Sequence, residues 1–198
     1  MYRYKKIFNW EKEVLSNLNN QIQGKIFYTS DLHLFHDNVI KLNDRPFQDM
    51  DEMVKFIVNK WNAKVKNCDL VRIIGDVGYP KNQQDVENVI KILSILNGDK
   101  ELVTGNHDTK FLKEKSFRKL FKKISLYDYA KDGKRKVVLF HYPIEEWNGY
   151  HNGSYHLFGH VHGNEDNLKQ IDRRFNVGMD VNGFVPVTLD ELITKAKI

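Results

Sequence analysis

The sequence contains little cysteine and no long hydrophobic run. Cys68 is the only cysteine among 198 residues, so no internal disulfide can form, and we expect a partly buried thiol in a reducing compartment. No apolar run approaches the roughly 18 residues that a membrane-spanning helix needs. The basic residues 1–6 are not followed by a continuous apolar segment, which argues against a secretory signal. These absences favour a cytoplasmic protein.

The sequence also lacks internal repeats, low-complexity tracts and Pro/Ser-rich linkers. A chain of this length, with 41% hydrophobic residues, can bury a core without disulfide or metal staples. We therefore expect residues 24–198 to form one domain. Residues 1–23 are expected to be an N-terminal extension, a packed helix with apolar positions at Phe8, Val14, Leu15 and Leu18.

The formal net charge of +5 is unevenly distributed. Residues 110–136 contain eleven Lys and Arg against three acidic residues, a local net charge of +8, so the rest of the chain carries about −3. One interpretation is a solvated helix face and a charged hairpin. The other is a patch that attracts a polyanion such as nucleic acid.

Apolar runs alternate with helical stretches in the first part of the chain and give way to hairpin strands later. The expected strands are 25–29, 70–74, 101–104, 124–130, 135–140, 157–158 and 174–181. The expected helices are 49–66, 82–97, 109–122 and 188–197. Asp132-Gly133 is a typical hairpin turn. This order predicts an α/β domain with a mixed sheet and helices on both faces.

Five short motifs are rich in metal-binding side chains: Asp31-Leu32-His33, Gly75-Asp76, Gly105-Asn106-His107-Asp108, His141 and Gly159-His160-Val161-His162. Most of them directly follow an apolar run, at the carboxyl end of a predicted strand. Open α/β sheets place their ligand sites there. Gly75, Gly105 and Gly159 allow the backbone to turn sharply beside bulky side chains. Converging loops could therefore bring the motifs to one point.

The side-chain types favour a particular group of metals. Carboxylate oxygens and imidazole nitrogens suit Zn²⁺, Mn²⁺ and Fe²⁺, whereas an all-carboxylate set would suit Mg²⁺ or Ca²⁺. The seven candidate ligands are Asp31, His33, Asp76, Asn106, His141, His160 and His162. We expect each Asp-x-His or His-x-His pair to lie on one side of an extended segment. Seven ligands are too many for one ion and suit two, which a carboxylate bridges at roughly 3.5–4 Å.

The ordered motifs resemble the calcineurin-like metallophosphoesterase superfamily, and most closely its small uncapped bacterial and phage members, over residues 24–190. The resemblance implies a four-layer α/β/β/α sandwich. It implies a first ion on Asp31, His33 and His162, a bridge at Asp76, and a second ion on Asn106, His141 and His160. The ions would be Mn²⁺, Fe²⁺, Zn²⁺ or Ni²⁺, with Mn²⁺ favoured. Many relatives continue with Asp-Arg or a similar polar pair where this chain has Val77-Gly78, which argues against the substrates of the protein-phosphatase branch.

The resemblance also implies a reaction. A hydroxide between the ions would attack phosphorus, and His107, oriented by Asp108, would protonate the leaving oxygen or stabilise the phosphoryl charge. The expected activity is that of a phosphodiesterase. The alternatives are a phosphomonoesterase, a nuclease that uses residues 110–136, and a non-catalytic binding scaffold.

Residues outside the five motifs are expected to complete the site. His36, Asn38 and Arg45 could bind substrate from a loop at its mouth, with Arg45 as the anion clamp, or could cap helices and form surface pairs. His151 and His156 are expected in loops, and Asp180 and Asn182 in turns.

Overall fold

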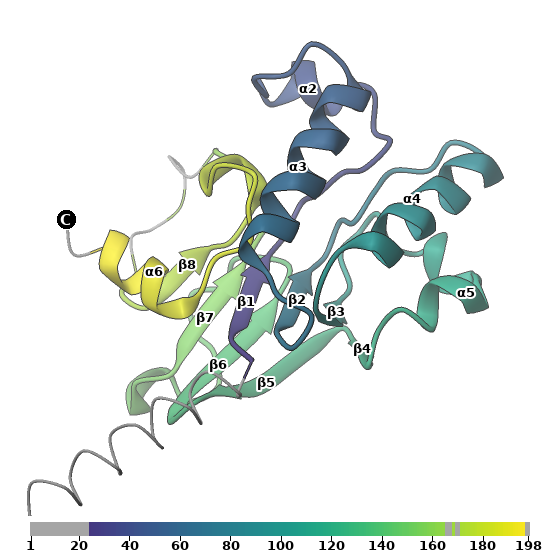
Figure 1. Ribbon diagram of the computed structural model, residues 1–198. Helices are drawn as coiled ribbons and strands as arrows, with labels where there is room; N and C mark the ends of the chain where they lie inside the picture. Colours follow the sequence, from purple (N-terminus) through teal and green to yellow (C-terminus); the bar gives the residue numbers. More distant parts are fainter. Residues whose placement is uncertain (1–23, 165–167, 169–170, 197–198) are drawn as a thin grey trace, which may run out of the picture.

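Two four-stranded β-sheets face each other in the computed structural model, which describes residues 24–164, 168 and 171–196 (Figure 1). The predicted helix in residues 1–23 lies outside the described residues. Among the described residues, no helix is long and apolar enough to cross a membrane. Cys68 is exposed, which corrects the expectation of a partly buried thiol.

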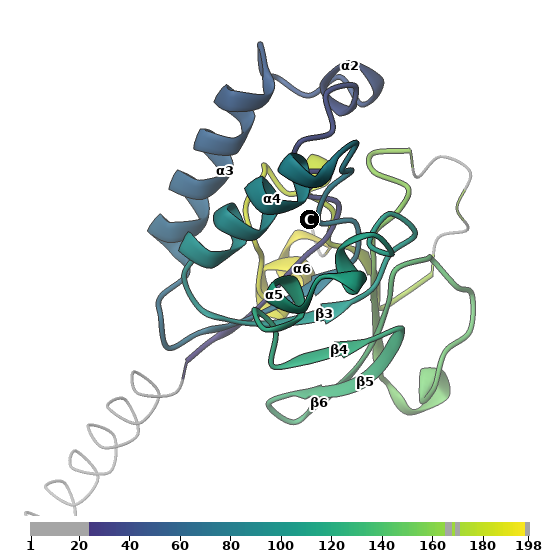
Figure 2. The same cartoon turned by 90° about the vertical axis from the view of Figure 1, so that its right-hand side faces the viewer.

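The first sheet is wholly parallel and is covered by helices on its outer face. It contains β1 (Ile26–Thr29), β2 (Leu70–Ile74), β3 (Asp99–Val103) and β4 (Lys123–Ser125), in that spatial order. The helices are α2 (Val39–Leu42), α3 (Met50–Lys64), α4 (Gln83–Ile95), the 3₁₀ helix η1 (Phe111–Lys113) and α5 (Lys115–Arg118). Helices α3, α4 and α5 lie on one side of this sheet (Figure 2). Parallel strands need such crossover helices. Because both faces of this sheet are buried, its strands are continuous apolar runs.

Capping side chains define where the two long helices begin. Asp49 accepts the backbone N–H of Glu52 at the start of α3. Asn82 and Asp85 form a reciprocal capping box at the start of α4. Trp61 of α3 is fully buried, and its indole N–H donates to the carbonyl of Asn97 at 3.0 Å. The caps stabilise the first turns of both helices, and the Trp61 bond joins α3 to the segment that follows α4.

The second sheet is mixed, as expected. It contains β5 (Tyr127–Asp132), β6 (Arg135–Phe140), β7 (Tyr155–Phe158) and β8 (Arg174–Asn176), and only the β5–β6 hairpin is antiparallel. The strand expected at 124–130 is divided between the two sheets. Ile124 packs with the helix-side core and Ala130 with the core between the sheets, so the chain crosses from one sheet to the other at Leu126.

Alternating side chains of the second sheet pack in opposite directions. Val137, Leu139 and Leu157 join the core between the sheets, to which α6 (Leu189–Lys195) adds Leu189 and Leu192. The alternate positions Val138 and His156 lie on the outer face. There His156 contacts the ring of Trp147, in the segment that contains the 3₁₀ helix η2 (Tyr150–Asn152).

The predicted α/β architecture of two sheets and helices is confirmed. Three local expectations are corrected. The helix expected at 109–122 is broken at Glu114, whose backbone is extended, into η1 and α5. His156 lies within β7 and is fully buried, so it is not a loop residue. The strand expected at 174–181 ends at Asn176 and is followed by the 3₁₀ helix η3 (Met179–Val181).

Candidate metal centre

The structure brings the side chains of all five motifs together at the carboxyl ends of β1, β2, β3, β6 and β7. Asp31 and Asp76 each lie two residues beyond their strands, and His141 follows β6 directly. The chain runs straight from these buried strands into the site, so the strands position the ligands. Both sheets contribute side chains to the same place.

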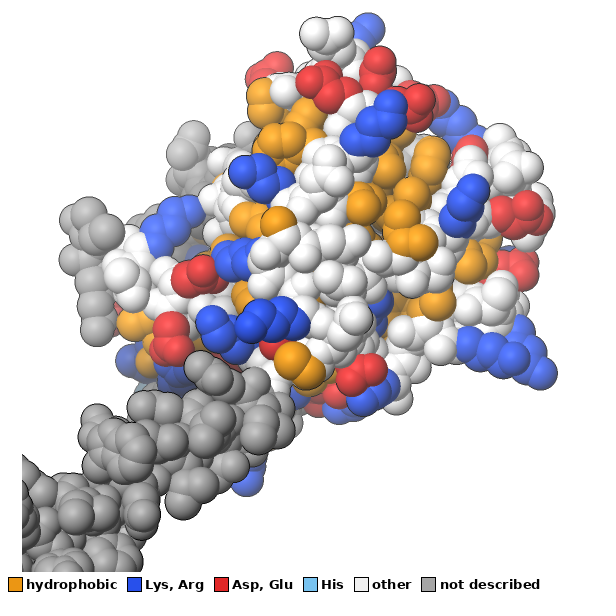
Figure 3. Space-filling model, viewed as in Figure 1, with side chains coloured by type: hydrophobic (Ala, Val, Ile, Leu, Met, Phe, Trp, Pro, Cys, Tyr) orange, Lys and Arg blue, Asp and Glu red, His pale blue; other side chains and the backbone are white. Residues whose placement is uncertain are grey.

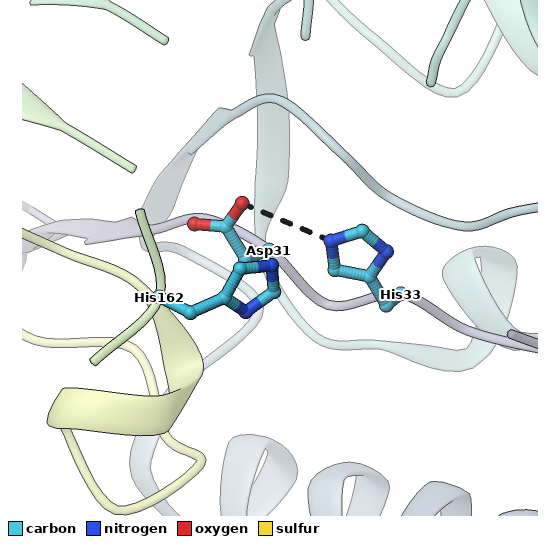
Figure 4. A group of neighbouring side chains, drawn as sticks. All are labelled: Asp31, His33 and His162. Atoms are coloured by element: carbon cyan, nitrogen blue, oxygen red, sulfur yellow. Dashed lines mark ion pairs between the residues drawn. The ribbon is translucent and has the colours of Figure 1, made fainter. Parts of the chain in front are cut away.

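One cluster consists of Asp31, His33 and His162 (Figure 4). A potential ligand atom on each of these side chains lies within 4.8 Å of those on the other two. Asp31 and His33 are buried, and His33 Nε2 lies 3.9 Å from Asp31 Oδ1. Both oxygens of Asp31 accept the backbone N–H of His160, at 3.1 and 3.0 Å, which links this cluster to the second.

The second cluster consists of Asp76, His141 and His160, again within 4.8 Å of one another. Asn106 Oδ1 lies 3.1 Å from His141 Nε2 and 3.1 Å from His160 Nδ1. His141 Nδ1 lies 2.8 Å from the carbonyl oxygen of Ile74, which leaves Nε2 facing the cluster. The amide oxygen of Asn106 therefore lies beside the candidate ligand atoms of this cluster.

The carboxylate of Asp76 lies between the two clusters. Its Oδ2 atom is 3.6 Å from His33 Nε2 and 3.4 Å from His141 Nε2. Burial acts to raise the pKa of Asp76, but the hydrogen bond and charge of His141, the backbone N–H of His107 and the charge of His33 outweigh it and lower the pKa to about 2. Asp76 is therefore ionised at neutral pH, as a metal-bridging carboxylate must be.

The remaining buried groups favour a bound cation. Burial raises the pKa of Asp31 to about 6, with a further contribution from Asp76 and against the charges of His141 and His162. Burial also lowers the pKa of His33 well below its ordinary value, so its imidazole is neutral. Two adjacent buried carboxylates repel each other, and a divalent cation between them would remove that cost.

The position of His33 Nε2 indicates that the first cluster could hold a metal ion. This atom is buried and has no hydrogen-bond partner among the described residues, yet it lies beside the carboxylates of Asp31 and Asp76. A neutral imidazole nitrogen that faces two carboxylates matches the donor arrangement of a divalent cation site. Nitrogen and oxygen donors of this kind suit Mn²⁺, Fe²⁺, Zn²⁺ and Ni²⁺.

The backbone at the ligands is left-handed at five positions. The φ values are 57° at Asp31, 49° at His33, 56° at Asp76, 73° at His160 and 52° at His162. The expectation that the Asp-x-His and His-x-His pairs lie on extended segments is therefore wrong. Such conformations cost roughly 1–3 kcal/mol each, and they persist where the surrounding packing enforces them, typically at functional sites.

Two glycines allow the loops to approach each other closely. Gly75 has a φ of 86°, and a Cβ there would lie 2.7 Å from the Cα of Gly105. A Cβ on Gly105 would collide with the carboxylate of Asp76. The expected sharp turn with a positive φ is present at Gly75 but not at Gly105 or Gly159. At Gly105 the absence of a side chain instead makes room for the carboxylate of Asp76.

Asp108 lies beneath the ligand loops and does not point at His107. Its Oδ1 accepts the backbone N–H of Val77 at 3.0 Å, and its Oδ2 accepts those of Asp76 at 3.0 Å and Gly105 at 2.7 Å. The side chain is fully buried. The predicted role in orienting His107 is therefore corrected, because these backbone amides engage both oxygens. Asp108 instead joins the loop after β2 to the loop after β3.

His107 lies at the solvent-facing side of the clusters. Its Nε2 is 3.8 Å from Asp76 Oδ2, and its side chain is 31% exposed. The ring packs edge-on against Tyr79 at 4.9 Å, and Tyr79 stacks on His36 at 4.6 Å. His36 Nδ1 lies 3.2 Å from His33 Nδ1, so His36 contacts a candidate ligand directly. These partly exposed rings form one wall of the site.

The other two expected substrate-binding residues differ in exposure. Asn38 is exposed at the N-cap of α2 and makes no side-chain capping bond. Arg45 is fully buried at its side chain, so it is not an exposed anion clamp. It donates to both oxygens of Asp180, at 2.8 and 2.9 Å, and to the carbonyl oxygens of Leu32 and Asp31, at 3.1 and 2.8 Å. No pattern in the sequence indicates that Arg45 pairs with the buried carboxylate of Asp180.

The contact of Asp180 with a candidate metal ligand is not predicted by the sequence. Asp180 lies in η3, where a turn role was expected, and its Oδ2 is 2.7 Å from His162 Nδ1. Burial acts to raise the pKa of Asp180, but the hydrogen bond from His162 and the charge of Arg45 outweigh it and hold the pKa below its ordinary value. No local sequence pattern indicates this contact, because His162 and Asp180 are 18 residues apart.

The fold and the site define an α/β protein with a candidate metal centre at the strand ends of two facing sheets. The chain belongs to the same family as an uncharacterized protein of Methanocaldococcus jannaschii, with 32% identity over 181 residues that cover 88% of this chain and 94% of the relative. No model of a known protein family matches the sequence.

The similarity of this chain to solved structures concerns its fold only. A protein of unknown function from Aquifex aeolicus superimposes with a TM-score of 0.70 at 23% identity, over 87% of this chain and 99% of that chain. The E. coli phosphoesterase Yfce gives a TM-score of 0.38 at 15% identity, over 77% of each chain.

Proposed function

We propose that this protein is a binuclear metal-dependent phosphoesterase of the calcineurin-like type. The observation that carries the proposal is the position of Asp76 Oδ2 between His33 Nε2, at 3.6 Å, and His141 Nε2, at 3.4 Å. One carboxylate shared by two histidine-rich clusters is the arrangement that two-metal hydrolases use for displacement at phosphorus. Two divalent ions bound there would supply Lewis-acid stabilisation of phosphoryl charge and would lower the pKa of water.

His107 is the proposed catalytic acid. It is a partly exposed histidine beside Asp76, so a phosphate ester held at the clusters would lie against its ring. Substrate would enter on this side, because His160 is also exposed whereas Asp31 and His141 are buried. Tyr79 lies beside His107, and the ring of Tyr142 lies 4.6 Å from that of His160. Both tyrosines could offer aromatic faces to the organic part of an ester.

The expected reaction is phosphodiester hydrolysis, with phosphomonoester hydrolysis as the second candidate. Hydrolysis of bis-p-nitrophenyl phosphate with Mn²⁺ tests it, and we expect the activity to be lost on addition of EDTA and restored by excess Mn²⁺. The same assay with p-nitrophenyl phosphate decides between the two ester classes. If the protein binds Mn²⁺ but hydrolyses neither ester nor an oligonucleotide, the non-catalytic scaffold is the better description.

The nuclease alternative receives less support from the positions of the basic residues. Arg135 begins β6, and His141 directly follows its other end, so these two residues lie roughly 20 Å apart along the strand. Lys122, Lys123 and Arg135 also pair with the carboxylates of Asp99, Asp128 and Asp190. Figure 3 shows Lys and Arg interspersed with Asp and Glu on the face drawn. This distribution favours the solvated-surface interpretation, and cleavage of single-stranded DNA that falls steeply with salt would favour the nuclease.

A further inference from the structure

Asp180 forms a buried bridge between a candidate metal ligand and an arginine. Its Oδ2 lies 2.7 Å from His162 Nδ1, while Arg45 donates through Nε to Oδ1 at 2.8 Å and through a terminal nitrogen to Oδ2 at 2.9 Å. The side chains are 0% exposed at Arg45, 8% at Asp180 and 15% at His162. Charge-assisted bonds in such a buried place are strong and well oriented.

Arg45 extends this bridge to the other half of the first cluster. Its terminal nitrogens also donate to the backbone carbonyl oxygens of Asp31 and Leu32, at 2.8 and 3.1 Å. One guanidinium therefore contacts both the loop that carries Asp31 and His33 and the carboxylate that contacts His162. The loop with Asp31 and His33 follows β1 of the first sheet, whereas Asp180 follows β8 of the second sheet.

Asp180 is poorly suited to be a metal ligand itself. Both of its oxygens are engaged by Arg45, and one of them also by His162. A cation bound to Asp180 would lie beside the buried guanidinium of Arg45, and the two charges would repel strongly at such a distance. The contact with His162 is instead the kind by which a carboxylate orients a ligand histidine through its second ring nitrogen.

We propose that Asp180 is a positioning residue that holds His162 in the Nδ1–H tautomer, with Nε2 directed at the Asp31–His33 cluster, and that Arg45 fixes Asp180 in this orientation. The inference rests on the metal centre of the proposed function. It predicts that the first ion site, and not the site of Asn106, His141 and His160, depends on Asp180.

The test is Mn²⁺ binding by isothermal titration calorimetry to the purified full-length chain and to Asp180→Asn. Loss of such a carboxylate typically weakens metal affinity by 10–100-fold. We expect a loss of that size at one of the two sites and less than about a threefold change at the other. Asp190→Asn is the matched control, because it removes an equally charged group whose side chain is 78% exposed. Wild-type affinity at both sites of Asp180→Asn would overturn the proposal.

A second measurement uses the metal-free wild-type protein, so it depends neither on the folding of a variant nor on metal binding. The ¹⁵N shifts of the His162 ring in the metal-free wild-type protein at pH 9 report which nitrogen carries the proton, and a merely structural role for Asp180 would not fix that nitrogen. We expect Nδ1–H, because Nδ1 faces a carboxylate oxygen. Observation of Nε2–H, or of a mixture of tautomers, would overturn the inference. This result is independent of ester hydrolysis, so failure of the proposed function and failure of the positioning role are separately visible.

Discussion

The Oδ2 atom of Asp108 accepts the backbone N–H of Asp76 at 3.0 Å, so the carboxylate of one motif holds the main chain of another. Asp108→Asn should lower the free energy of unfolding of the metal-free protein by about 1–3 kcal/mol, because an amide NH₂ would face backbone N–H groups that need an acceptor. Urea unfolding measures this change. Asp99→Asn removes a carboxylate that is 48% exposed and is the control, with an expected change within about 1 kcal/mol. Equal stability of the two variants would contradict the structural role of Asp108.

Gly105→Ala should disrupt the site through sterics alone. The new methyl group would collide with the carboxylate of Asp76, so either this loop or the shared carboxylate must move, at a cost of about 1–3 kcal/mol. We expect weakened Mn²⁺ binding by calorimetry, with both sites affected. Gly163→Ala is the control, since a Cβ at Gly163 meets no atom within 4 Å. Unchanged affinity in Gly105→Ala would mean that Asp76 does not need its present position.

His107→Ala should reduce kcat for bis-p-nitrophenyl phosphate by roughly 10²–10⁴-fold, the usual contribution of a positioned general acid. Mn²⁺ content should stay at the wild-type value, because the ring of His107 lies beside the candidate ligands and is not one of the seven. Inductively coupled plasma spectrometry and steady-state kinetics provide the two readouts. His151→Ala removes an exposed histidine in η2 and should leave kcat unchanged. A normal rate in His107→Ala would exclude the catalytic role.

His156 should make the protein sensitive to acid. Burial lowers the pKa of His156 to about 4, against hydrogen bonds to the carbonyl oxygens of Val138 and Tyr142. The unfolded chain binds a proton near pH 6.5 and the folded chain only near pH 4, so stability is full above pH 6.5 and falls as the pH decreases between these values. We expect His156 to account for a loss of about 3 kcal/mol in the free energy of unfolding over this range, because its pKa is roughly 2.5 lower in the folded than in the unfolded chain.

The difference in unfolding free energy between wild type and His156→Gln, measured by urea titration from pH 7 to pH 4, isolates this contribution from the carboxylates. We expect the wild-type protein to lose more stability than the variant over this range. Parallel curves for the two proteins would show that the pKa of His156 is not lowered.

The sequence predicted the strands and long helices well, because their signals are local. Buried strands such as β2 appear as unbroken apolar runs, and α4 has apolar positions at helical spacing after a capping residue. The strand at 124–130 was misassigned because Ile124, Leu126 and Tyr127 keep strand-like apolar and aromatic residues running across the crossing. Pairing partners distant in sequence, β3 for one part and β6 for the other, decide the division.

The candidate ligands could be identified from the sequence because their motifs lie at strand ends. Their surroundings could not, because these depend on contacts across the fold. Arg45 and Asp180 are 135 residues apart, and nothing local indicates that a basic and an acidic residue so separated are buried together. The left-handed backbone at Asp31 and His33 is likewise imposed by packing, since neither residue type requires it.

The origin of the ligands in both sheets has a consequence for folding. Asp31, Asp76 and Asn106 follow strands of the first sheet, whereas His141 and His160 follow strands of the second. Ions bound by both groups would join the sheets at one end, while the covalent crossing at Leu126 joins them through β4 and β5. The free energy of metal binding would then also be free energy of sheet–sheet docking. Substitutions in the core between the sheets, far from any ligand, should therefore weaken metal affinity in proportion to the docking energy that they remove.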